Sequence, residues 1–312
     1  MDVQRIGIHE SVATVFPPDV LAEHLADHLP EAGPAVAVVG DDDLRDCDAV
    51  VTFEHREAFL EHVAWVHSIQ AGVDRFSLAA FESAGVVLTN SAGIHDESVG
   101  ETVAGYMLSF ARRLHRHRDA QRERTWRPPA WDEAFTLAGE TVCVVGLGTL
   151  GRGVVERANA LGMTVTGVRR SGDPVEGVER VATPDRLPEA VADARFVVLA
   201  VPLTDETRGL VGPDELAAMR PDAYLVNVAR GGVVDQDALV AALRDGALAG
   251  AALDVFEVEP LPAESPLWDL EEVVVSPHCA AFTRDYYRDV GALVRENLDR
   301  VRADDPLHNR VA

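Results

Sequence analysis

Short apolar runs alternate with longer amphipathic segments along most of the chain. Runs that are apolar throughout are typical of strands buried on both faces of a parallel sheet. In the first part of the chain we expect such strands at residues 36–39, 49–53, 65–69 and 85–90. In the second part we expect them at residues 141–146, 164–168, 196–201, 223–229, 250–256 and 272–277.

The segments between these runs carry apolar residues at helical spacing. Residues 17–29 begin with two prolines, which is typical of a helix start. One long helix is expected to begin near Glu97, with acidic residues in its first turn, and to continue to Leu114. Residues 283–303 form a last helix that could return to the first domain. Alternating strands and helices of this kind predict an α/β protein with a doubly wound parallel sheet.

Length and composition exclude several classes of protein. The 312 residues are enough for two domains, and they contain neither a membrane-spanning apolar run nor a signal peptide at the start. The three cysteines are too few and too scattered for a disulfide framework or a zinc site, so no metal is expected. We therefore expect a soluble, cytoplasmic protein.

The charge is strongly negative. Asp and Glu total 52 against 28 basic residues, every one of which is Arg, and the net charge is −24. Such a surface repels nucleic acid and anionic membranes, so neither is expected as a partner. Self-repulsion falls when salt shortens the Debye length to roughly 3 Å near 1 M. We hypothesise a high-salt cytoplasm, with GC-rich coding as the alternative explanation for the absence of lysine.

Residues 112–127 oppose this trend. The segment RRLHRHRDAQRERTWR is rich in arginine and precedes a proline-marked connection. Because the rest of the chain is acidic, we expect this segment to pack on acidic protein surface, with a second subunit as one candidate, and not on nucleic acid.

A glycine-rich turn follows the strand at residues 141–146. Gly146, Gly148 and Gly151 form a G-x-G-x-x-G pattern between a strand and a helix, the context in which the pattern predicts a dinucleotide site. The amides of Thr149 and Leu150 are then expected at the helix N-terminus, where positive charge favours a pyrophosphate.

The end of the next strand carries no acidic residue. A carboxylate there would bind the adenosine ribose hydroxyls, whereas this chain has Arg169, Arg170 and Ser171. Guanidinium groups bind phosphate and a hydroxyl adds a further bond. The segment therefore favours NADP(H) over NAD(H), with solvated surface arginines as the alternative.

Three later motifs follow strands. Arg230 lies in NVARGG, Asp254 and Glu259 in DVFEVEP, and His278 in SPHCAAFT. Ligands of open parallel sheets bind beyond the carboxyl ends of the strands, so these side chains could converge.

These motifs, together with VHSIQAGVD and LTNSAGIHDESVGETVAGYMLSF, resemble the D-isomer-specific 2-hydroxyacid dehydrogenases over nearly the whole chain. The resemblance implies a Rossmann dinucleotide-binding domain, residues 99–285, inserted into a smaller flavodoxin-like substrate domain, residues 1–98 and 286–312. It also implies that the long helix and arm build a homodimer.

The resemblance implies a role for each matching residue. Arg230 would bind and polarise a 2-oxo acid, His278 would be the general acid in NADPH-dependent reduction to the D-2-hydroxy acid, and Glu259 would pair with His278 and favour its protonated form. Phe53, Ala71 and Gly72 would contact the substrate. Pro202, Thr207, Asp254 and Ala280 would contact the cofactor. Ala281 departs from the family, which usually has glycine there.

The substrate is left open by the sequence. Phe53, with few charges around it, favours a small or apolar 2-oxo acid, including glyoxylate, hydroxypyruvate and branched-chain acids. Formate and phosphonate dehydrogenases are related alternatives, and Glu259 disfavours the former because they carry Gln there. A dinucleotide-sensing corepressor-like binding protein is the alternative from another class.

The salt hypothesis makes a stability prediction. The urea midpoint of unfolding is expected to rise between 0.1 M and roughly 2 M KCl because screening relieves the repulsion among acidic side chains. Sucrose, which does not screen charge, serves as the control for general stabilisation by excluded solutes. Equal midpoints at low and molar KCl would contradict the hypothesis.

Overall fold

The computed structural model describes all residues from 1 to 312 and divides into two compact units. The first comprises Met1–Ile94 and Phe282–Ala312, and the second comprises His95–Ala281. The boundaries expected from the sequence lie four residues later at each junction (98 against 94, and 285 against 281). None of the helices combines the length and apolarity needed to cross a bilayer.

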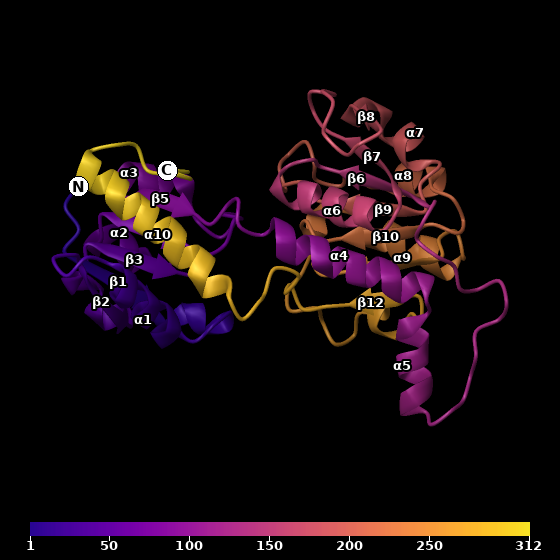
Figure 1. Ribbon diagram of the computed structural model, residues 1–312, viewed down its shortest axis with the longest axis horizontal. Coiled ribbons are helices and arrows are strands. Elements are labelled where there is room, and N and C mark those ends of the chain that lie inside the picture. The colour runs from indigo at the N-terminus through magenta and orange to yellow at the C-terminus, as the bar shows by residue number, and fades with distance from the viewer. The chain divides into compact units, whose positions relative to one another are not determined.

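The first unit contains a five-stranded sheet in which all pairings are parallel and the order is β2-β1-β3-β4-β5 (Figure 1). This is the flavodoxin-like order. The strands are β1 (Arg5–His9), β2 (Ala35–Val39), β3 (Ala49–Thr52), β4 (Trp65–Ser68) and β5 (Val87–Asn90). The helices are α1 (Pro18–His28), α2 (Glu57–His62), α3 (Leu78–Ala84) and α10 (Tyr286–Ala303), with 3₁₀ turns at Glu10–Thr14 and Asp41–Asp46.

Both faces of this sheet are covered. One apolar cluster joins α1 and α10 to the sheet, and a second joins α2 and α3 to the opposite face. The prediction of a buried strand at residues 36–39 is wrong in its burial, because β2 is an edge strand and Val38 remains exposed. The C-terminal residues pair with β5 through Leu88 and Val311, so both chain ends belong to this unit.

The second unit is a seven-stranded parallel sheet in the order β12-β11-β10-β9-β6-β7-β8. Strand order reverses between β6 and β9, as in a Rossmann fold. The strands are β6 (Thr141–Val145), β7 (Thr164–Val168), β8 (Arg180–Ala182), β9 (Phe196–Leu199), β10 (Tyr224–Asn227), β11 (Gly250–Leu253) and β12 (Val273–Val275). The helices are α4 (Asp96–Ala111), α5 (Leu114–Arg122), α6 (Thr149–Ala160), α7 (Leu187–Val191), α8 (Pro213–Ala218) and α9 (Gln236–Arg244). Short 3₁₀ turns lie at Pro184–Arg186, Gly231–Val233 and Pro266–Asp269.

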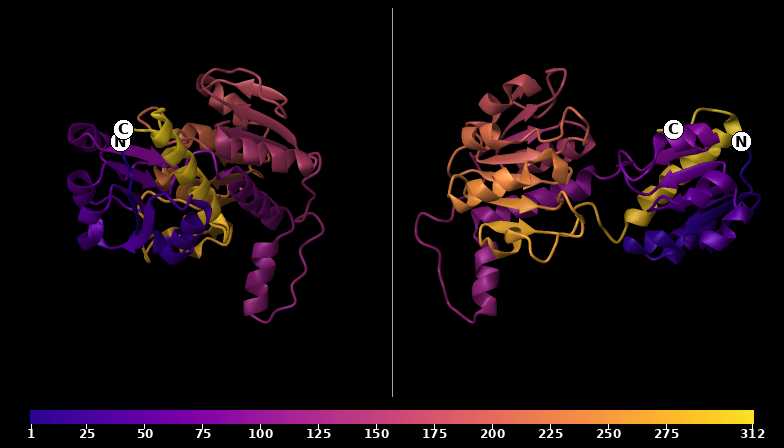
Figure 2. Two further views of the ribbon diagram at one scale, coloured as in Figure 1. Left: turned by 60° about the vertical axis from the view of Figure 1, so that its left-hand side comes forward. Right: turned by 180° about the vertical axis from the view of Figure 1, so that it is seen from behind.

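Two apolar clusters cover the two faces of this sheet, with α4 and α6 on one side and α7, α8 and α9 on the other. The α/β fold predicted from the sequence, with two parallel-sheet units, is confirmed. The helix α5 and the segment that follows it project from the rest of this unit, as both views of Figure 2 show.

The single long helix expected up to Leu114 is instead two helices. Helix α4 ends at Ala111, and Arg113 adopts a left-handed backbone conformation with φ 56°. The Arg113 guanidinium donates to the backbone oxygen of Glu133 at 2.9 Å and to the hydroxyl of Tyr224 at 3.0 Å. These bonds to distant residues stabilise a break that helical periodicity alone does not reveal.

Helices α4 and α6 cross at two glycines. A Cβ added to Gly153 would lie 1.9 Å from the backbone oxygen of Asp96, and one added to Gly100 would lie 2.6 Å from the backbone oxygen of Gly153. Any larger side chain must therefore separate the two helices and disrupt the cluster between them.

This crossing predicts the effect of a single methyl group. Gly153→Ala should lower the free energy of unfolding by about 1–3 kcal/mol because the Cβ meets backbone, which cannot rotate away. Gly105→Ala is the control in the same helix pair, since nothing lies within 4 Å of its added Cβ. That control should stabilise by up to about 1 kcal/mol through helix propensity. Chemical denaturation measures both, and equal effects would contradict the close crossing.

Candidate active site

The glycine turn connects β6 to α6 at the point where strand order reverses. Gly146 has φ 98°, a conformation that favours glycine, and its added Cβ would lie 2.5 Å from the backbone oxygen of Ala200. A Cβ on Gly151 would lie 1.9 Å from the backbone oxygen of Gly146. A Cβ on Gly148, in contrast, would meet nothing within 4 Å. The turn is thus closed by its own backbone, while Gly148 leaves its outer side open for a ligand.

A pocket of about 520 Å³ lies beside this turn. It brings together several residues that the sequence predicted for the cofactor: Gly146, Gly148, Arg169, Arg170, Ser171, Pro202 and Thr207. Thr149, Leu150 and Gly151 follow in the first turn of α6, whose first amides have no partner within the helix. The donor set fits a dinucleotide: backbone amides at a helix N-terminus for the pyrophosphate, and cationic groups beyond β7.

Two charged residues of the pocket were missed from the sequence. Arg152, in the first turn of α6, adds a third guanidinium to those of Arg169 and Arg170, and Glu206 adds the one acidic group. Only the three-dimensional arrangement shows that Arg152 lies beside the same pocket, although its position directly after the glycine pattern was a usable signal. With three cations against one carboxylate, the lining favours phosphate in a protein that is acidic elsewhere.

His278 and Glu259 form a close pair. The Nδ1 atom of His278 lies 2.7 Å from Glu259 Oε2, and the other carboxylate oxygen, Oε1, accepts from the amide of Phe256 at 3.1 Å. The side chains are 28% and 27% exposed, so solvent reaches the pair. Because a carboxylate only accepts, Nδ1 carries a hydrogen, and Nε2 is the nitrogen that can exchange a proton with a ligand.

Asp254 organises the loop that carries His278. Its backbone oxygen accepts from the His278 amide at 2.8 Å, and its carboxylate accepts from the amides of Cys279 at 3.0 Å and Ala280 at 2.9 Å. The side chain, 2% exposed, also accepts from the hydroxyl of Ser276 at 2.6 Å. The Ala280 amide and the Asp254 carboxylate are hydrogen-bonded to each other in this loop. The cofactor contact that the sequence suggests for these two residues stays a prediction.

Arg230 lies on the neighbouring strand end. It follows β10, and its Nη1 donates to the backbone oxygen of Ala229 at 2.7 Å. The Asn227 amide donates to the Arg230 backbone oxygen at 3.0 Å. A Cβ on Gly231 would lie 1.9 Å from the backbone carbon of Phe256, so this turn packs directly against the segment that bonds Glu259. Strands β10, β11 and β12 are adjacent, and the second unit therefore groups Arg230, Glu259 and His278 at neighbouring strand ends.

In the first unit, Phe53 follows β3. It is 6% exposed, and its amide donates to the Ser11 hydroxyl at 3.2 Å. The guanidinium carbon of Arg75 lies 4.8 Å from the centre of its ring. The sequence predicts few charges around Phe53, and this prediction is wrong in one respect, because the Arg75 cation lies directly against the ring. Arg75 is distant in sequence, and no pattern pointed to this contact.

Ala71 and Gly72 lie in the loop after β4. The side-chain amide of Asn90 donates to the backbone oxygen of Ala71 at 2.6 Å, and the Ser91 amide donates to Gln70. Beneath this loop the buried His67 ring lies 2.8 Å from the hydroxyl of Thr89 and 3.1 Å from that of Ser91. His67 was not predicted as a functional residue. It acts as a support for the loop.

Comparisons with known proteins identify the family of this chain. Residues 104–280 match the family model described as "D-isomer specific 2-hydroxyacid dehydrogenase, NAD binding domain". The chain is 35% identical over 270 residues to a glyoxylate reductase of Korarchaeum cryptofilum, covering 82% of this chain and 80% of that one. It is 35% identical over 244 residues to a D-3-phosphoglycerate dehydrogenase of Methanocaldococcus jannaschii, but spans only 46% of that relative's length.

A solved structure extends the similarity to the whole chain. It is a D-isomer specific 2-hydroxyacid dehydrogenase from Xanthobacter autotrophicus in complex with NADPH and MES, 32% identical, with a TM-score of 0.84 over 100% of this chain and 98% of that one. The fold and the glycine turn define an NAD(P)-binding oxidoreductase. The chain belongs to the D-isomer-specific 2-hydroxyacid dehydrogenase family.

The buried His67 predicts an acid-dependent change in stability. Burial lowers the pKa of His67 to about 3, so the unfolded chain, with the ordinary value near 6.5, binds the proton first as pH falls. The neutral His67 imidazole therefore makes its full contribution to the free energy of unfolding above pH 6.5. That contribution decreases toward pH 3, by about 1.4 kcal/mol per pH unit.

A substitution isolates that contribution. His67→Gln should destabilise the protein at pH 7 because the bonds to Thr89 and Ser91 change, but the cost should shrink by about 2–3 kcal/mol at pH 4.5. Urea denaturation of both proteins at the two pH values measures the difference. His62→Gln, at an exposed position in α2, is the control. A cost for His67→Gln that is the same at both pH values would contradict the assignment of a buried neutral imidazole.

Proposed function

We propose that this protein reduces a 2-oxo carboxylic acid to the D-2-hydroxy acid, with NADPH as the reductant and His278 as the general acid. The observation that carries the proposal is the 2.7 Å contact between His278 Nδ1 and the Glu259 carboxylate. This contact fixes the imidazole orientation and leaves Nε2 as the nitrogen that can exchange a proton with a ligand.

The chemistry divides among the protein's own groups. When bound, the dihydronicotinamide supplies a hydride to the ketone carbon. His278 Nε2 gives its proton to the ketone oxygen as that oxygen gains charge, and Glu259 holds the ring in the orientation for that transfer. The Arg230 guanidinium binds the substrate carboxylate and polarises the ketone. Phe53 and the amides of Ala71 and Gly72 are proposed to bind the rest of the substrate. The next turnover then requires His278 to regain a proton from solvent, which its exposure permits.

The preference for NADP(H) rests on charge. Arg169, Arg170 and Ser171 line the pocket beyond β7, where the family's NAD-binding members are expected to carry an acid. Two guanidinium groups attract a 2′-phosphate, and a hydroxyl adds a hydrogen bond. The NADPH bound to the Xanthobacter relative supports the same preference. The pyrophosphate is assigned to Gly146, Gly148, Gly151 and the amides of Thr149 and Leu150. Pro202, Thr207, Asp254 and Ala280 are assigned to the remainder of the cofactor.

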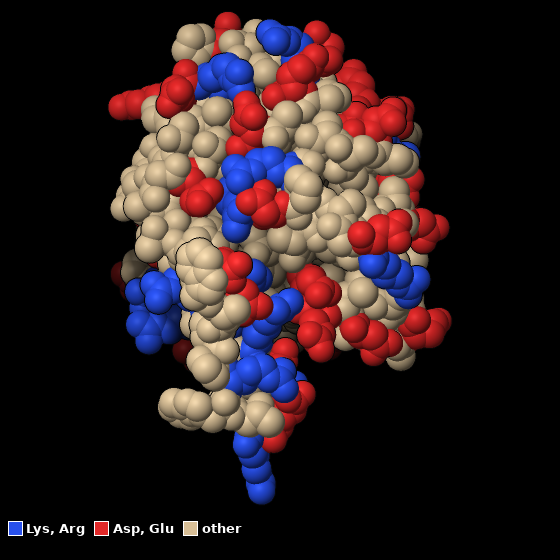
Figure 3. All heavy atoms as spheres, turned by 90° about the vertical axis from the view of Figure 1, so that its right-hand side faces the viewer, with Lys and Arg blue, Asp and Glu red and all other residues tan.

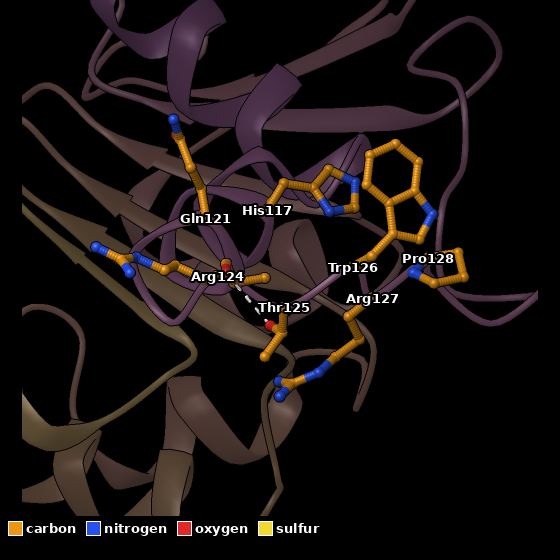
Figure 4. A pocket seen from close by; sticks show the side chains of 8 residues that line it. His117, Gln121, Arg124, Thr125, Trp126, Arg127 and Pro128 are labelled. Atoms are coloured by element: carbon orange, nitrogen blue, oxygen red, sulfur yellow. Dashed lines mark hydrogen bonds between the residues drawn. The ribbon is translucent and has the colours of Figure 1, made fainter.

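We also propose a homodimer built by the arm formed by α5 and residues 123–135. Trp126 is 99% exposed and Trp131 is 94% exposed, and aromatic residues and arginine are enriched at interfaces. The side chains of Trp126 and Pro128 border a hollow of about 530 Å³, from which Arg124 and Arg127 extend (Figure 4). Figure 3 shows blue side chains gathered along the projecting arm and red ones over much of the surface beside it. A second copy of the chain offers both the apolar cover for the tryptophans and acidic groups for the arginines.

The high-salt adaptation remains a proposal of the same kind, supported by the net charge of −24.

The cofactor assignment predicts a change of affinity. Arg169→Asp should weaken NADPH binding at least about tenfold, because a charge-assisted bond worth roughly 1.5–3 kcal/mol is replaced by repulsion. NADH binding should be unchanged or stronger, since the new carboxylate can accept from the ribose hydroxyls. Fluorescence titration gives both dissociation constants. Arg244→Asp, the same charge change outside the pocket, is the control, and unchanged affinities in the Arg169 variant would contradict the assignment.

The acid role of His278 predicts a loss of turnover. His278→Ala should lower kcat with glyoxylate, hydroxypyruvate or a branched-chain 2-oxo acid by roughly 10²- to 10⁴-fold, while NADPH affinity changes little. His62→Ala is a control at an exposed histidine. Full reductase activity in the His278 variant would rule out the mechanism. The wild-type protein binding NADPH but reducing no 2-oxo acid would instead favour a dinucleotide-sensing binding protein.

A further inference from the structure

The loop that carries His278 is tied to helix α4 by two side chains. Thr102 Oγ1 donates to the backbone oxygen of Ala280 at 2.9 Å, and the Tyr106 hydroxyl lies 2.5 Å from Ser276 Oγ. Residues four apart lie on one face of a helix, so both groups reach the loop from the same side. We call Thr102 and Tyr106 the α4 clamp. It holds the loop on both sides of His278.

These hydrogen bonds form a series that ends at the Asp254 carboxylate. Because a carboxylate only accepts, it sets the direction of each bond in the series. The Asp254 carboxylate, already bound by the amides of Cys279 and Ala280, accepts from the Ser276 hydroxyl at 2.6 Å. Since Ser276 gives its single hydrogen to Asp254, its oxygen must accept from Tyr106. The order is therefore Tyr106 to Ser276 to Asp254. Burial raises the pKa of Tyr106 to about 12, so the phenol keeps its hydrogen at neutral pH.

The loop needs such support because its backbone is strained. His278 has φ 51°, a left-handed conformation that costs a residue with a Cβ roughly 1–3 kcal/mol. Such a conformation persists only when surrounding bonds fix it. In this loop the amides of residues 278–280 all bond Asp254, while the α4 clamp bonds Ser276 before His278 and Ala280 after it.

We propose that Tyr106 and Thr102 are positioning residues for His278, acting through Ser276, Asp254 and Ala280 without touching substrate themselves. The inference rests on the proposed acid role of His278 for its effect on turnover. It adds that the position of the imidazole depends on a helix of the same unit. Loss of the clamp lets the loop relax away from φ 51° and moves Nε2 out of line with the ketone oxygen.

The test uses single-hydroxyl changes in the full-length protein. Tyr106→Phe removes one hydroxyl and keeps the ring, and Thr102→Val removes another, while Thr102→Ser retains it and should restore wild-type behaviour. Tyr287→Phe is the matched control in the first unit, where the hydroxyl contacts only the exposed Arg288. In Tyr106→Phe and Thr102→Val, hydrogen exchange at the amides of residues 278–280 should become at least about tenfold faster. Tyr287→Phe should leave that exchange unchanged.

Kinetics separate positioning from general stability. Tyr106→Phe should lower kcat roughly 10- to 100-fold with the NADPH dissociation constant within about twofold of wild type, as expected for a displacement of about 1 Å in a reacting group. A lower melting temperature with wild-type kcat, or wild-type exchange at residues 278–280, would overturn the proposal. If the wild-type protein reduces no 2-oxo acid, the proposed function fails, whereas the exchange measurement still decides whether the clamp orders the loop.

Discussion

One buried carboxylate determines where the loop that carries His278 lies. Asp254 accepts hydrogen bonds from three consecutive amides, those of His278, Cys279 and Ala280, through its backbone oxygen and its two carboxylate oxygens. A buried acceptor left without these donors would cost several kcal/mol, so loop and carboxylate stabilise each other. In this position of the loop, His278 Nδ1 lies 2.7 Å from Glu259 Oε2, and that contact fixes the orientation of the imidazole.

In two places the local charge is positive although the chain as a whole is acidic. The protein carries a net charge of −24, yet three arginines line the dinucleotide pocket and seven occur in residues 112–127. An acidic surface repels an anionic cofactor and so weakens its binding. A local cluster of guanidinium groups offsets that repulsion where the phosphates are proposed to bind. The second cluster lies beside exposed tryptophans, where we propose that it meets the acidic surface of another subunit.

Much of this could be predicted from the sequence because buried parallel strands and a glycine turn are local patterns. Strands such as β6 and β7 are continuous apolar runs, and Gly146, Gly148 and Gly151 lie within six residues of one another. The strand β1 was missed because RIGIH has polar ends and a central glycine. A Cβ on that glycine, Gly7, would lie 2.6 Å from Val39, so the residue type is set by packing that only the fold reveals. The three-residue strand β8 was too short to stand out.

What could not be predicted depends on contacts between residues far apart in the chain. The break after Ala111 comes from Arg113 bonding Tyr224, the clamp joins Tyr106 to Ser276, and Arg75 lies against Phe53. In each of these contacts the partner of a polar group is set by the tertiary structure. The sequence near that group gives no signal of which distant residue it will meet. The proposed roles of Arg230, Glu259 and His278 rested on motifs at three strand ends, and adjacent strands do carry these residues.

The configuration of the product is the sharpest test of the proposed reduction. The protein should be incubated with NADPH and a prochiral 2-oxo acid such as hydroxypyruvate, and the 2-hydroxy acid formed should be resolved by chiral chromatography. The D-enantiomer alone should form, in a one-to-one ratio with oxidised cofactor, because the hydride reaches one face of the ketone. Formation of the L-enantiomer, or of a racemic mixture, would contradict the proposed reduction.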